Sequence, residues 1–237
     1  MGFRLLFGQY TDIQHCVDVG GVTTAGDAPG YDERTAVVPS GDWRPIAEEE
    51  AEQLRPDATT PRSLLVELVT HPLPVDAAAD LDARRQAAAA LDPLDGRWPR
   101  ERLACADSPP GLLTTTRDHD NGNRRIGLHV DNFDRQPYPT RLNSRRRLAL
   151  NMGPGSRYLL LADRTIMDIC AELGRDQNGH LPHTDDLRRY IADGHPLRCF
   201  RIRLDPGQGY IAPTEVVPHD GSTADAATWS VAAFWLG

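Results

Sequence analysis

Hydrophobic and polar positions change their spacing near residue 110 of the chain. Before that point, residues 44–54 and 74–94 are rich in Ala, Glu, Leu and Arg and are bounded by proline, which predicts two helices. After it, short apolar runs alternate with turn signals such as DNGN, GPG and DPGQG, which is typical of β-strands. A further helical pattern interrupts these runs at about residues 164–194.

This spacing predicts one domain, residues 1–237, with mainly β structure and some helix. We expect residues 1–110 to form a helical and loop layer. We expect residues 111–237 to form a jelly-roll-like β core, with the insertion at 164–194 and the N-terminal helices packed on one of its sheets.

Composition and charge narrow the classes of function. The chain has 26 basic and 34 acidic residues, a net charge of -8, and no lysine, which excludes lysine nucleophiles and Schiff bases. An acidic chain is a poor binder of nucleic acid, and no apolar run reaches the length of a membrane span. The four cysteines form no CxxC pair. We therefore expect a cytoplasmic protein that binds neither nucleic acid nor membrane.

The segment GLHVDNFD, residues 127–134, places two polar side chains in a predicted strand. Residues two apart in a strand point the same way, so His129 and Asp131 share a face. A hydrogen-bonded pair in the core would also explain this pattern. A second histidine, His219, follows an apolar run and precedes a turn. Two imidazoles and one carboxylate can occupy one face of an octahedral Fe(II) ion and leave positions for a cosubstrate and O2.

These residues resemble a known family. The strand-borne HVD of residues 129–131, the distal His219 and the short strands around them are similar to the Fe(II)/2-oxoglutarate-dependent oxygenases, over about residues 111–237. The resemblance implies a double-stranded β-helix in which His129, Asp131 and His219 bind Fe(II). It also implies 2-oxoglutarate and O2 as cosubstrates, and a ferryl species that abstracts hydrogen from a small molecule such as an amino acid or a natural-product intermediate. Hydroxylation is the default outcome.

The chain departs from many family members in the anchor for 2-oxoglutarate. Residues 221–237, after the distal histidine, contain neither arginine nor lysine. A second branch, which resembles the asparaginyl and JmjC-type hydroxylases, carries its basic anchor on the strand after HxD, here SRRRLALNM. On that strand Leu148, Leu150 and Met152 form an apolar face, so the alternate side chains should face the interior. The predicted contacts to the cosubstrate are Arg147 as first choice, Asn151 as a secondary polar contact and Arg157 as the rival anchor.

Polar residues beside the metal ligands are suited to binding the charges of a small substrate at the mouth of the barrel. The candidates are Asn132, Asp134, Arg135, Thr214, Glu215 and Asp220. Residues 180–186, HLPHTDD, offer further histidines and carboxylates, but Pro182 breaks their helical spacing. We predict a helix start there, with Thr184 as its N-cap.

Two other classes of function stay open on the sequence alone. A cupin-like metalloenzyme that does not use 2-oxoglutarate would account for the missing C-terminal arginine. A non-catalytic β-sandwich binding module would account for His129 and Asp131 as a hydrogen-bonded core pair.

Overall fold

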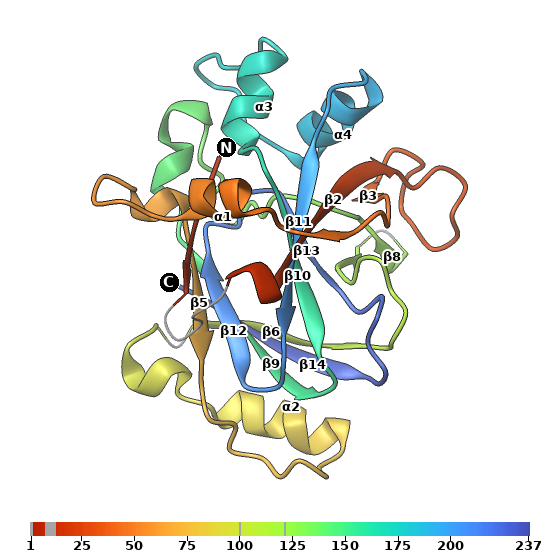
Figure 1. The fold of residues 1–237 in the computed structure, drawn as a ribbon, viewed down its shortest axis with the longest axis vertical. Coiled ribbons are helices and arrows are strands. Elements are labelled where there is room, and N and C mark those ends of the chain that lie inside the picture. Colours follow the sequence, from red (N-terminus) through yellow and green to blue (C-terminus); the bar gives the residue numbers. More distant parts are fainter. Residues whose placement is uncertain (1, 8–12, 100, 121) are drawn as a thin grey trace.

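The chain folds mainly into β-strands (Figure 1). The computed structural model describes residues 2–7, 13–99, 101–120 and 122–237. These ranges contain 14 strands, in two six-stranded sheets and one short hairpin, together with four α-helices. The prediction of a mainly β protein with some helix is therefore confirmed.

The first sheet combines strands from both ends of the chain. All of its neighbouring strands are antiparallel except β1 and β5, which are parallel. In spatial order the strands are β1 (Arg4–Phe7), β5 (Leu65–Thr70), β12 (Gln208–Ala212), β9 (Arg147–Pro154), β14 (Ser230–Leu236) and β6 (Glu101–Ser108).

The second sheet is antiparallel throughout. Its order is β13 (His219–Ser222), β10 (Arg157–Ala162), β11 (Arg198–Leu204), β2 (Val17–Thr24) and β3 (Val37–Pro39), and β4 (Arg44–Pro45) also pairs with β2. The hairpin of β7 (Arg117–Asp118) and β8 (Arg124–Arg125) is separate.

The two sheets pack face to face over an apolar core. Leu5, Val66 and Leu68 of the first sheet lie in one cluster with Leu159 and Phe200 of the second. Side chains alternate between the two faces of a strand, so each of these strands also presents an outer face. Helices cover those outer faces.

Strand β9 illustrates this alternation. Leu148, Leu150 and Met152 lie in an apolar cluster with Ala88 of α2 (Leu81–Ala90), as strand parity predicted. The alternate residues of β9 therefore face the space between the sheets.

Three further helices complete the structure. Helix α1 (Glu48–Leu54) buries Ala51 and Leu54 in the core between the sheets. Helices α3 (Ile166–Glu172) and α4 (Thr184–Ala192) follow β10 and pack on the outer face of the second sheet. Figure 1 places α2 at the bottom of the molecule and α3 with α4 at the top. None of the helices in the described ranges is both long enough and apolar enough to cross a membrane.

The N-terminal part differs from the layer of helices and loops that we predicted for residues 1–110. It contributes β1, β2, β3, β4, β5 and β6 to the two sheets. The reason is that β2, β5 and β6 each pair with a strand from the C-terminal half, and a local sequence pattern carries little information about such distant partners. Helices α1 and α2 are also shorter than the predicted ranges.

Candidate functional site

The three predicted metal ligands converge at one edge of the second sheet. His129 and His219 face each other across an isolated antiparallel bridge, and each backbone N–H donates to the carbonyl of the other, at 3.0 and 2.8 Å. Directly opposed residues of such a pair project to the same side of a sheet. Asp131, two residues after His129, projects to that side as well, and its N–H donates to Thr214 O at 3.0 Å.

Hydrogen bonds orient both imidazole rings in the same way. Nδ1 of His129 lies 2.9 Å from Gly127 O, and Nδ1 of His219 lies 3.2 Å from Val217 O. A carbonyl can only accept, so both Nδ1 atoms act as donors, and the Nε2 atoms of His129 and His219 lie 3.7 and 3.8 Å from the carboxylate oxygens of Asp131. Metal-binding histidines are commonly held by this type of second hydrogen bond.

The ligand atoms of the three residues form a compact, buried group. They all lie within 4.8 Å of one another, and the residues are only 3%, 8% and 0% exposed for His129, Asp131 and His219. Burial, together with the nearby Arg147 and His129, lowers the pKa of His219 well below its usual value, which keeps the imidazole neutral. Two imidazoles and one carboxylate, without a thiolate, suit Fe(II) better than a structural zinc site.

Arg147 of β9 lies directly against this group. Its Nη1 is 2.9 Å from Asp131 Oδ2, and its Nη2 is 2.5 Å from His219 Nε2. The guanidinium also lies 5.1 Å from the centre of the Phe234 ring. Arg147 faces the interior, as predicted. Its partner there is Asp131, whereas the sequence analysis predicted 2-oxoglutarate.

Arg157, the rival anchor, has no such partner. It begins β10, is 6% exposed, and donates from Nη2 to Thr115 Oγ1 at 3.3 Å. In the part of the chain that the structure describes, its Nη1 has no hydrogen-bond partner, and no carboxylate forms an ion pair with it. Burial lowers the pKa of this guanidinium, although an arginine stays protonated at neutral pH. A buried, unpaired cation is costly unless a ligand supplies the anion.

Glycine at position 221 makes room for this arginine. A Cβ atom at that position would lie 2.6 Å from Arg157 Nη2 and 2.6 Å from Thr115 Oγ1. Gly221 lies on β13, two residues after the metal ligand candidate His219. The short strand β13 therefore carries a metal ligand candidate, His219, and also provides the space that Arg157 occupies.

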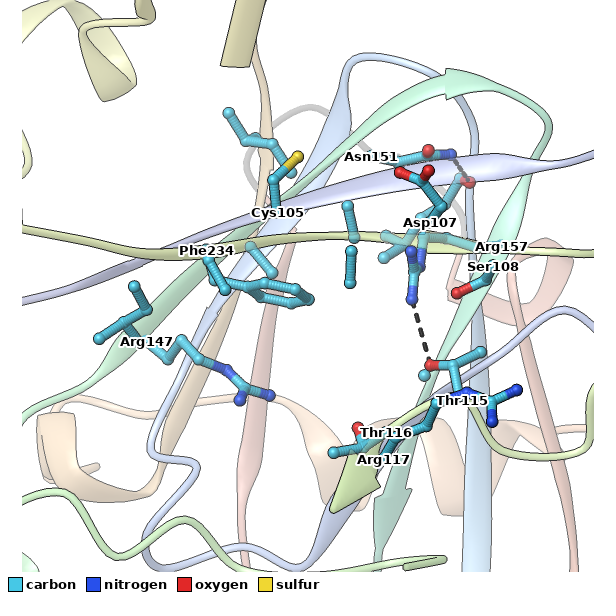
Figure 2. Close-up of a pocket in the computed structure, with 18 of the residues that line it drawn as sticks. Cys105, Asp107, Ser108, Thr115, Thr116, Arg117, Arg147, Asn151, Arg157 and Phe234 are labelled. Atoms are coloured by element: carbon cyan, nitrogen blue, oxygen red, sulfur yellow. Dashed lines mark hydrogen bonds between the residues drawn. The ribbon is translucent and has the colours of Figure 1, made fainter. Parts of the chain in front are cut away.

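Both arginines line one cavity of about 760 Å³ between the sheets. Figure 2 shows their guanidinium groups directed into the same space, with Phe234 beside Arg147 and Thr115 below Arg157. Asp131 also lines the cavity. A space of this size accommodates a small organic molecule.

Asn151, the predicted secondary contact, lines the cavity, but its side chain forms hydrogen bonds only with backbone groups. Its Nδ2 donates to Gly155 O and Leu204 O, both at 2.9 Å, and its Oδ1 accepts from Gly153 N at 2.9 Å. Asn151 therefore holds a turn in place and has no donor left for a ligand.

The six predicted substrate contacts lie elsewhere. Glu215 pairs with Arg141 at 3.2 Å, Asp134 pairs with Arg145 at 2.8 Å, and Asp220 is fully buried. The cavity lining includes none of the six: Asn132, Asp134, Arg135, Thr214, Glu215 and Asp220. They are close to the metal ligands in sequence, but the side chains of four of them, Asn132, Asp134, Glu215 and Asp220, bond to other parts of the chain.

Arg141 is a functional residue that the sequence analysis missed. It is 0% exposed and donates from Nη2 to Asp131 O at 2.6 Å and from Nε to Glu215 O at 2.7 Å. It thereby joins the loop after His129 to the loop before His219. No signal in YPTRLN, a segment that reads as a turn, distinguishes this arginine from a surface residue.

A second group of donors, Cys170, His180 and Asp186, also lies within 4.8 Å. The oxygens of Asp186 already accept from Arg175 at 2.6 Å, His180 at 3.0 Å and the N–H of His183 at 2.9 Å. Burial raises the pKa of the Cys170 thiol to about 12, so without a metal ion the thiol is protonated at neutral pH. This group stabilises the start of α4, whose N-cap is His183, not Thr184 as predicted.

Neither the models of protein families nor the curated protein sequences match this chain.

Proposed function

We propose that this protein is an Fe(II)- and 2-oxoglutarate-dependent oxygenase that acts on a small organic molecule. One observation carries the proposal: two imidazoles lie beside a carboxylate, and this carboxylate lines one cavity together with a buried arginine that has no acidic partner among the described residues. The first three match the donor set of a non-heme iron site. The buried arginine requires an anionic ligand, because no carboxylate of the described residues neutralises it.

The course of the chain through the sheets supports a double-stranded β-helix. From residue 101 onward the chain visits the first sheet with β6, the edge of the second sheet with the bridge at His129, and the first sheet again with β9. Strands β10 and β11 then lie in the second sheet, β12 in the first, β13 in the second and β14 in the first. Eight such positions, which change sheet at every step except from β10 to β11, are typical of a jelly roll.

In this proposal His129, Asp131 and His219 hold Fe(II), with their backbone positions held by the bridge and by Arg141. The bound iron supplies the activation of O2, coupled to the oxidation of 2-oxoglutarate. The residues of the chain orient the ligands and keep water out of a space enclosed by two sheets.

Arg157 binds the distal carboxylate of 2-oxoglutarate in this proposal, in place of Arg147. The physical reason is the different pairing of the two cations: Arg147 already has Asp131 at 2.9 Å, whereas Arg157 has only a hydroxyl at 3.3 Å. A guanidinium–carboxylate pair satisfies two parallel donors at once. The arginine expected first from strand parity is therefore assigned to the metal end of the cavity.

An anaerobic titration tests the proposal. Fe(II) and 2-oxoglutarate should together produce a weak visible charge-transfer band, and neither should produce it alone. Arg157→Met should weaken 2-oxoglutarate binding by about thirtyfold or more, which is the usual cost of removing one partner of a buried charge pair, and should leave Fe(II) affinity unchanged. His219→Ala should lose metal binding.

Other outcomes point to the alternatives. Metal binding without the band would favour a cupin-like metalloenzyme that does not use 2-oxoglutarate. Absence of both metal binding and the charge-transfer band would favour a non-catalytic binding module. Succinate release in a screen of amino acids and related small molecules would then identify the substrate in a protein that passes the titration.

A further inference from the structure

The cavity contains residues that neither the metal nor 2-oxoglutarate uses. The buried end is marked by Arg157, which is 6% exposed, and the open end by Phe133, which is 45% exposed. Arg117 and His119 also line the cavity and are exposed. The rim is therefore formed by the β7 segment and by the loop that follows Asp131.

The charges around the cavity do not cancel. Its lining includes four arginines, Arg85, Arg117, Arg147 and Arg157, against two aspartates, Asp107 and Asp131. Arg85 forms an ion pair with Asp107, and Arg147 pairs with Asp131. This leaves Arg117 and Arg157 as the excess, in a chain whose net charge is -8.

Binding of the proposed cofactors does not remove this excess. Fe(II) brings two positive charges and 2-oxoglutarate brings two negative ones, so the loaded cavity is still cationic. A concave surface of one sign raises the local concentration of ligands of the opposite sign. The remaining ligand, the substrate, is therefore expected to be an anion.

Arg117 is the guanidinium available to that anion. Its Nη1 donates a hydrogen bond to Asn123 O at 3.0 Å, and no carboxylate in the described ranges pairs with it. Its backbone is well anchored, because the preceding Thr116 donates from N and Oγ1 to Asp220 at 3.0 and 2.8 Å. Asp220 adjoins His219, so this arginine is tied to the strand that carries a metal ligand candidate.

One part of the cavity lining, on β6 and β14, is apolar. Ala104 and Ala106 of β6 and Ala232 of β14 line the cavity with Phe234, and Phe133 adds a half-exposed ring at the rim. In the register of the sheet, Ala232 lies opposite Ala106 and Phe234 opposite Ala104. Such a surface favours a hydrocarbon skeleton over a polar one.

We infer that the substrate is a mainly apolar organic acid whose anionic head group, carboxylate or phosphate, binds Arg117 at the rim. Its hydrocarbon part lies along the alanine wall between Phe133 and Phe234. This inference rests on the proposed function, since it assigns Arg157 to 2-oxoglutarate and leaves Arg117 for the substrate.

Binding of matched probes tests the inference. The full chain is loaded with Zn(II), as a redox-inert substitute for Fe(II), and with saturating 2-oxoglutarate. Saturation-transfer NMR then compares 4-phenylbutanoate and phenethyl phosphate with 4-phenylbutanamide and 4-phenylbutylamine. We expect at least about tenfold tighter binding of an anionic probe than of the amide, and none of the amine. The anionic probe that binds more tightly, carboxylate or phosphate, identifies the head group.

Two variants of one hairpin provide the matched control. Arg117→Gln should abolish the preference for the anion, whereas Arg124→Gln, on the paired strand β8 and outside the cavity lining, should retain it. Circular dichroism checks that both variants are folded. The inference is overturned if the wild type binds the amide as well as the anion, or if both variants behave alike.

A separate measurement of 2-oxoglutarate binding in the same samples distinguishes the two failures. Bound 2-oxoglutarate with no anion preference refutes the substrate class and leaves the proposed function intact. An anion preference that depends on Arg117, in a protein that does not bind 2-oxoglutarate, refutes the oxygenase and retains the anion site.

Discussion

Replacing Arg147 by methionine should tighten metal binding, although the arginine contacts the metal ligand candidates directly. The guanidinium lies 2.9 Å from Asp131 Oδ2 and 2.5 Å from His219 Nε2, so a metal ion that uses these atoms must displace it. Methionine keeps an aliphatic chain of similar reach and removes the positive charge. The variant therefore offers the same three ligands without a competing cation.

Coulomb's law sets the magnitude. A guanidinium displaced to about 6 Å from a divalent ion repels it by about 1.4 kcal/mol even at the dielectric constant of water, and by more inside a protein. An energy of about 1.4 kcal/mol corresponds to about tenfold in affinity, which is the smallest gain we expect. The metal-free variant should also be less stable by about 3–5 kcal/mol, because Asp131 stays buried without its counter-ion.

Calorimetric titration with Mn(II) measures the affinity, and urea unfolding measures the stability with and without metal. Arg147→Lys, which keeps the charge, should stay near the wild type in metal affinity. A folded Arg147→Met protein that binds Mn(II) as weakly as the wild type, or more weakly, would refute the reasoning. It would mean that the guanidinium does not compete with the ion.

Three further variants test other parts of the structure. Gly221→Ala should displace Arg157, because its Cβ would lie 2.6 Å from Nη2, and titration should find weaker 2-oxoglutarate binding with unchanged Mn(II) affinity; equal loss of both would contradict this assignment. Arg141→Met should lower the free energy of unfolding in urea by about 3–5 kcal/mol, and a change below about 1 kcal/mol would show that the buried arginine is dispensable. A hydrogen bond from Arg44 lowers the pKa of Glu50 from 4.5 to about 2, so its contribution to stability is complete above pH 4.5 and is lost as the pH falls towards 2. Wild type and Glu50→Gln should accordingly differ by about 1 kcal/mol at pH 6 and converge near pH 2, and a gap independent of pH would exclude this carboxylate as the cause.

Local patterns predicted the parts of the site that depend on strand geometry. The period of two residues in a strand placed His129 and Asp131 on one face, and the apolar positions of β9 directed Arg147 towards the interior. Both relations hold because neighbouring residues of one strand determine them. The structure places His129, Asp131 and His219 together, as the resemblance implied.

Local patterns failed where distant segments supply the partner. The N-terminal strands β2, β5 and β6 pair with C-terminal ones, so their short runs resembled loops. Asn132, Asp134 and Glu215 looked available for substrate, but each has a partner from another loop or turn. Arg141 carried no local signal, because its acceptors come from two separate loops.

The sequence by itself determined which side chains share a face, and hence that a histidine, an aspartate and an arginine would point into the same interior. Only the tertiary structure decided how the arginines divide between their partners. Arg147 meets Asp131 in the space between the sheets, and Arg157 meets no carboxylate in the described ranges. The physical reason is that the pairing of a buried charge depends on which strands become neighbours, and that is settled only when both sheets have formed.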